Sequence, residues 1–221
     1  MRKQNMTDAE MKARLNELYL PPTTDFVLVD VPEMRFVMID GHNAADRSAL
    51  DHAVKWLFAA LYPIKRAARE RMGKNFVEPP LEGLWWADDM EDLVRGNREK
   101  LNWRMMIVFE PDWLTAEMFD DAVASVKARL GDPPPPLRLD HLHEGLSAQI
   151  MHVGPCEEAR PILARLHHEY LPRHDLVPSG FHHEIYLTRI SQIRSCAMAR
   201  FVHVFPVIQG FPAFLRGAPS G

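Results

Sequence analysis

The chain has 221 residues, a formal net charge of -4 and a pI near 6.3. Its hydrophobic share of 47% and charged share of 25% are ordinary for a globular protein. The mild acidity gives no support to nucleic acid or an anionic membrane as a direct partner. No segment approaches the roughly 18 apolar residues of a membrane helix, and no apolar signal-peptide stretch opens the chain. We therefore expect a cytoplasmic protein.

The first third of the chain predicts a helix, two strands and a long helix. Residues 1–24 are expected to form a helical extension, because Thr7 or Asp8 can cap a helix that the prolines at 21–22 end. The runs 26–31 and 35–40 predict strands, and their short connection predicts a hairpin. A helix is predicted from 46 to 72. Its apolar residues recur at spacings of three and four and predict a core stripe: Leu50, Val54, Leu57, Phe58, Leu61 and Ile64.

The remaining elements follow in a similar order. Strands are predicted at 84–87 and 103–109, and Thr115 can cap a helix that ends at Leu130, before Gly131. Four consecutive prolines at 133–136 favour a stiff, extended connection. Further predictions, in chain order, are a strand pair at 137–141 and 146–153, a helix at 157–171, strands at 181–187 and 199–207, and an irregular tail at 209–221.

This order predicts a pseudo-repeat. Phe36-Val-Met-Ile-Asp-Gly41 is similar to Gln149-Ile-Met-His-Val-Gly154, and a predicted helix follows each. The two repeats span about 25–132 and 137–208, in an α+β domain of residues 25–208. Each repeat would supply a sheet face that it cannot cover alone, so we expect a ligand cleft where the halves meet.

The strand 181–187 carries the most informative polar pattern. A period of two places His182, Glu184 and Tyr186 on one face. The other face is mostly apolar (His183, Ile185 and Leu187), and we expect it to pack on helices. A carboxylate beside a phenol either faces water or lines a cavity, and we favour the cavity. Aromatic walls would raise the pKa of Glu184 and let it transfer a proton near neutral pH. An exposed strand face, or an anion that selects cations without chemistry, is the alternative.

Other polar and aromatic groups give weaker signals. Trp85 and Trp86 are adjacent on a predicted strand, so one indole should face the core and the other the cleft; two core tryptophans are the alternative. Asp88 and Asp89 lack the spacing of a calcium loop. The histidines show no i, i+4 pair and no CxxC companion, so we expect no metal. Cys156 and Cys196 predict two free thiols. No phosphate-binding, dinucleotide or nucleophile-elbow motif occurs, and we expect no cofactor.

Five segments together resemble the stand-alone branch of the GyrI-like small-molecule-binding domain family, from about residue 15 to 188. They are residues 29–41, Pro80-Leu-Glu-Gly-Leu-Trp-Trp-Ala-Asp-Asp89, Trp103-Arg-Met-Met-Ile107, residues 149–155 and His182-His-Glu-Ile-Tyr-Leu187. The resemblance implies a duplicated β-α-β-β (SHS2-type) fold, with an antiparallel sheet, two main helices and a central ligand groove. It also implies a small hydrophobic or planar ligand.

In the stand-alone branch, the resemblance implies a hydrolase that opens the cyclopropane ring of DNA-alkylating cyclopropanoid compounds. Glu184, Tyr186 and Tyr62 are the implied catalytic residues. The implied ligand-binding residues are Trp85, Trp86, Trp103, Met105, Met151 and His182. A non-catalytic binder of hydrophobic cationic drugs and a DNA gyrase inhibitor-like module are the alternatives, and a homodimer is left open. After Leu187 the sequence departs from the family pattern, and the apolar run 201–214 suggests a partner surface or an aggregation-prone segment.

Overall fold

The chain folds into two compact units, which a computed structural model describes over residues 16–73, 79–109, 114–134, 137–154, 156–187 and 199–209. Unit 1 comprises residues 1–32 and 144–221, and unit 2 comprises residues 33–143. Residues 16–19 are helical; the rest of the predicted N-terminal helix, the tail beyond 209 and Cys196 lie outside the described residues. Within the described part, no helix combines the length and apolarity needed to cross a membrane.

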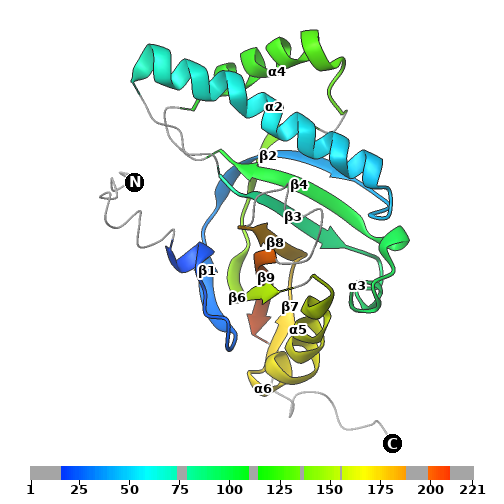
Figure 1. The fold of residues 1–221 in the computed structure, drawn as a ribbon. Helices are drawn as coiled ribbons and strands as arrows, with labels where there is room; N and C mark the ends of the chain where they lie inside the picture. The colour runs from blue at the N-terminus through cyan, green and yellow to red at the C-terminus, as the bar shows by residue number, and fades with distance from the viewer. Residues whose placement is uncertain are drawn as a thin grey trace, which may run out of the picture. The chain divides into compact units, whose positions relative to one another are not determined.

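Unit 2 is an antiparallel sheet with two long helices (Figure 1). Its strands lie in the order β3-β4-β2-β5. The elements are β2 (Met34–Gly41), α2 (Arg47–Met72), β3 (Leu81–Trp86), α3 (Glu91–Arg95), the 3-10 turn η1 (Arg98–Lys100), β4 (Asn102–Val108), α4 (Ala116–Leu130) and β5 (Arg138–Leu142). α2 packs against β2, β4 and α4, so one helix covers the middle of the sheet.

Unit 1 has the strand order β1-β6-β9-β8, and β7 pairs with the far end of β9. The strands are β1 (Val27–Val31), β6 (Gly145–Gly154), β7 (Leu176–Pro178), β8 (His182–Tyr186) and β9 (Ala199–Gln209). The helical connection after β6 consists of η2 (Cys156–Ala159), α5 (Arg160–Arg165), the π-helical turn η3 (Leu166–Tyr170) and α6 (Leu171–Arg173).

The two units repeat one topology. In unit 2, β2 is followed by α2, β3 and β4, and β4 pairs with both β2 and β3. In unit 1, β6 is followed by the helical connection, the short strand β7, β8 and β9, and β9 pairs with both β6 and β8. All of these pairs are antiparallel. The predicted α+β fold of duplicated β-α-β-β repeats is therefore confirmed.

The predicted hairpin and the later predicted strand pair are both wrong. β1 pairs with β6 rather than with β2, and β5 pairs with β2 rather than with β6. A two-residue hairpin turn needs a positive φ, and neither Pro32 nor Glu33 has one. The chain therefore continues from unit 1 into unit 2 at residues 32–33 and returns at 143–144. As a result, β1 belongs with the later repeat and β5 with the earlier one, which differs from the predicted repeat boundaries.

The long helix follows the predicted bounds closely. Asp46 caps it by accepting hydrogen bonds from the backbone amides of Ser48 (3.0 Å) and Ala49 (3.1 Å), and Gly73 ends it with φ 62°. Four residues of the predicted core stripe are buried, and Trp56 and several alanines are buried with them. Val54 and Phe58 are only partly buried, so the buried face of the helix is centred on Ala53, Trp56, Leu57 and Ala60.

Candidate functional site

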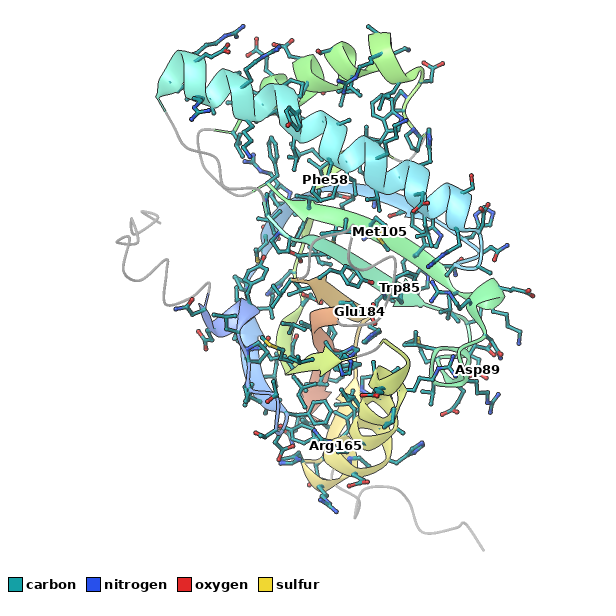
Figure 2. The ribbon with its side chains drawn as sticks, in the orientation of Figure 1. Phe58, Trp85, Asp89, Met105, Arg165 and Glu184 are labelled. Carbon is teal, nitrogen blue, oxygen red and sulfur yellow. The ribbon has the colours of Figure 1, made fainter. Side chains whose placement is uncertain are left out.

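Glu184 lies at the centre of a buried polar cluster on unit 1 (Figure 2). The β8–β9 register sets it directly opposite His203. Its Oε1 atom lies 3.1 Å from Nε2 of His182, and its Oε2 atom accepts a hydrogen bond of 2.5 Å from the Tyr186 hydroxyl. Nδ1 of His203 lies 3.3 Å from Nε2 of His182 and 3.8 Å from Oε1 of Glu184. These contacts confirm that His182, Glu184 and Tyr186 share one face.

The cluster is protected from solvent, but not closed. His182 and His203 are 2% and 0% exposed, whereas 21% of the Glu184 side chain is exposed. The ring of Phe205 lies 4.7 Å from that of His182 and 5.9 Å from that of His203, measured between centroids. Aromatic packing therefore holds both imidazoles in place, and the Glu184 side chain is more accessible to solutes than either histidine.

The pKa of Glu184 is lower than predicted. Burial by itself raises it, but the hydrogen bond and the electrostatic interaction with His182, assisted by the Tyr186 hydroxyl, outweigh burial and lower the pKa from 4.5 to about 2. The predicted rise is therefore wrong, and the carboxylate is ionised at neutral pH. Burial, together with the neighbouring His182, lowers the pKa of His203 to about 3, so that imidazole is neutral there.

Helices cover the face of the sheet that carries this cluster. Phe205, which stacks on His182, also contacts the ring of His167 in η3, with the centroids 6.4 Å apart. The expectation that helices pack on the His183 face is therefore wrong. Hydrogen bonds among His182, Glu184, Tyr186 and His203 lower the cost of covering that face. On the other face, Nδ1 of His183 lies 3.0 Å from Oε2 of Glu144, and both side chains are buried.

Met151 does not join this cluster. The register aligns Glu184 with His203 and Ile150, and aligns Ile185 with Val202 and Met151. The side chains of successive cross-strand rows point to opposite faces of a sheet, so the Met151 side chain lies on the face opposite Glu184.

The tryptophans predicted to bind ligand belong to unit 2. Trp85 pairs with Trp103 across β3 and β4, and both are buried. Nε1 of Trp103 donates to the carbonyl oxygen of His42 at 3.2 Å, and its indole covers Gly41. Trp103 is therefore packed in the core of its own unit.

The other predicted residues of unit 2 have different surroundings. Trp86 is only partly buried, and the guanidinium carbon of Arg104 lies 6.0 Å from its ring centroid. Met105, labelled with Trp85 in Figure 2, is 3% exposed on β4. Tyr62 lies on α2 and is 73% exposed, which argues against a place in an enclosed site.

The sequence predictions missed His203 and Phe205. The signal was present, since a histidine stands between valines in Phe201-Val-His-Val-Phe205. A polar side chain in the middle of an apolar strand needs a hydrogen-bonding partner, and the partners of His203 lie on the neighbouring strand.

Comparison with known proteins agrees with this architecture. Residues 24–191 match the model of the GyrI-like small molecule binding domain. A solved protein from Listeria innocua, described as uncharacterized and conserved, is 29% identical with a TM-score of 0.76. A solved protein described as a hydrolase from Listeria innocua is 28% identical with a TM-score of 0.72. Each alignment covers 90% of this chain and 98% of the other. No match was found among curated proteins.

The matched range includes both β-α-β-β cores except for β9, and it contains Glu184 and Tyr186. Because it covers most of the chain, we conclude that this protein belongs to the GyrI-like small-molecule-binding domain family.

Proposed function

We propose that this protein is a hydrolase that opens the cyclopropane ring of DNA-alkylating cyclopropanoid compounds. The observation that carries the proposal is the Glu184 carboxylate, which is ionised, partly exposed and held between His182 and Tyr186. The hydrolase description of similar proteins from Listeria innocua supports the class of reaction.

The reaction joins one water molecule to a strained carbon. The water oxygen forms a bond to a cyclopropane carbon, and the adjacent ring C–C bond breaks. Its electron pair moves through the conjugated dienone to the carbonyl oxygen, which becomes a phenolate and finally takes up the proton that the water loses. A carboxylate with a low pKa is a weak base, so Glu184 would act mainly by accepting a hydrogen bond from the water and orienting it.

Tyr186 would act as a positioning residue. Its hydroxyl donates to Oε2 of Glu184, which fixes the carboxylate plane. The flat indoles of Trp85 and Trp86 remain proposed ligand contacts, whereas the 73% exposure of Tyr62 argues against the catalytic role that the family resemblance implies for it. Each of these roles can be tested separately by substitution with alanine or phenylalanine.

The test is to incubate the purified protein with a duocarmycin-type cyclopropanoid and to quantify ring-opened product by liquid chromatography and mass spectrometry. We expect turnover well above the buffer rate, and a loss of roughly 100-fold in Glu184→Gln, which keeps the size but removes the charge that orients the water. Wild-type turnover at the buffer rate would refute the proposal. Undiminished turnover by Glu184→Gln would refute the role of the acid.

A second candidate is the binding of hydrophobic cations without chemistry. The negative charge of Glu184 at neutral pH favours it, since an ionised and partly desolvated carboxylate attracts a cation without having to release a proton. Tetraphenylphosphonium titrated into the wild type and Glu184→Gln separates the two candidates. Charge-dependent binding without ring-opened product from the cyclopropanoid would favour this second function.

A further inference from the structure

We propose that His182, Glu184 and His203 form a binding site for a divalent transition-metal ion such as Zn²⁺. Their three facing atoms are Nε2 of His182, Oε1 of Glu184 and Nδ1 of His203. Two imidazole nitrogens and one carboxylate oxygen are a donor set that suits zinc, and also iron, cobalt and nickel. The inference does not depend on the proposed hydrolysis, because it concerns a metal ion in the absence of substrate.

The size of the cluster is the main argument. The three separations are 3.1, 3.3 and 3.8 Å. The point equidistant from the three atoms lies about 2.0 Å from each, which matches the usual length of zinc bonds to imidazole nitrogen and carboxylate oxygen. An ion at this point, or slightly above the plane of the three atoms, would contact all of them without a change of backbone.

The surroundings hold these donors in place. His182 and His203 are almost fully buried and stack against Phe205. The Tyr186 hydroxyl binds the second carboxylate oxygen, which leaves Oε1 directed at the histidines. Outer hydrogen bonds of this kind orient metal ligands. The partial exposure of Glu184 provides an approach for the ion and a fourth position for water.

Sequence spacing could not reveal this site. His182 and Glu184 are two residues apart on β8, and His203 enters from β9 through the cross-strand register. The expectation of no metal was based on helical and CxxC spacings, which do not describe donors on neighbouring strands. The histidine on the other face, His183, points away from the cluster and is already bound to Glu144.

The test is isothermal titration of Zn²⁺ into protein stripped with a chelator. We expect one ion per chain, with affinity at least tenfold weaker in His203→Asn and in Glu184→Gln. Replacement of the exposed His141 by alanine is the control for adventitious surface binding and should change nothing. Circular dichroism shows whether each variant is folded.

Cobalt provides a second readout that needs no variant. Co²⁺ bound by two nitrogens, one carboxylate oxygen and a water molecule should give the intense visible absorption of four-coordinate cobalt, and zinc should displace it. The absence of stoichiometric binding to the wild type would overturn the proposal, as would equal binding by His203→Asn and Glu184→Gln. Neither result bears on turnover of the cyclopropanoid, so the two proposals fail independently.

Discussion

Replacement of Gly41 by alanine should destabilise the protein strongly. Gly41 lies opposite Trp103 in the β2–β4 register. A Cβ atom at this position would lie 2.1 Å from Cζ2 and 2.4 Å from Cε2 of the indole, whereas carbon atoms in contact stay about 3.5 Å apart. Gly41 has no positive φ, so the cost is steric rather than conformational. The Trp103 indole must move by roughly 1 Å or more, because the added Cβ atom is fixed to the backbone of β2, which cannot shift.

The magnitude follows from two contributions. Overpacking costs about 1–3 kcal/mol, and displacement of the indole breaks the hydrogen bond to the His42 carbonyl oxygen, which contributes about 1 kcal/mol. Together they predict a loss of about 3 kcal/mol, or a fall in Tm of about 6–12 °C for a chain of this size. Urea and thermal unfolding, followed by circular dichroism, measure both quantities.

The indole provides its own control. In a Trp103→Leu background the obstructing ring is absent, so Gly41→Ala should cost less than about 1 kcal/mol. Gly73→Ala is a second control: nothing lies within 4 Å of its Cβ position, and its cost should reflect only the positive φ of 62°. A Tm of Gly41→Ala within about 1 °C of the wild type would refute the close contact between Gly41 and the Trp103 indole.

Three further predictions concern single side chains. Asp46→Ala should lower the free energy of unfolding by about 1 kcal/mol, because α2 loses its N-cap, and Asp46→Asn should restore most of it. Burial raises the pKa of Asp40, but Arg104 at 2.6 Å and Arg138 at 3.1 Å outweigh it and lower that pKa. The stabilisation should therefore be complete above the ordinary aspartate pKa and disappear as the pH falls below it. The stability difference between wild type and Asp40→Asn, measured by urea unfolding, should shrink over that range, and a constant difference would contradict this assignment. Tyr186→Phe should slow the proposed turnover roughly tenfold by freeing the Glu184 carboxylate, while its thermal unfolding stays close to wild type; an unchanged rate would argue against a positioning role.

Local sequence patterns predicted the elements better than their pairing. The bounds of the long helix, the cap at Thr115 and the period-two face of His182, Glu184 and Tyr186 depend on neighbouring residues, and the structure confirms them. β1 and β5 each pair with a strand that lies a hundred or more residues away, and a short connection cannot reveal such partners. A hairpin was the obvious local choice and was wrong.

The candidate site shows the same division. The carboxylate and the phenol could be found from their spacing on one strand. The pKa of Glu184 could not, because it is set largely by contacts with His182, whose ring is held by β9 residues. Burial alone predicts a raised pKa for Glu184. Only the geometry of the hydrogen bonds shows that they lower the pKa by more than burial raises it.

The pairing of β1 with β6 has a consequence for synthesis on the ribosome. Unit 2 is one uninterrupted stretch of chain, whereas unit 1 is divided into two pieces on either side of it. The whole of unit 2 therefore emerges and can fold while β1, made earlier, still lacks the neighbour that covers its backbone. Until β6 appears, β1 presents unpaired amide and carbonyl groups, and in this interval the nascent chain is most exposed to association with other chains.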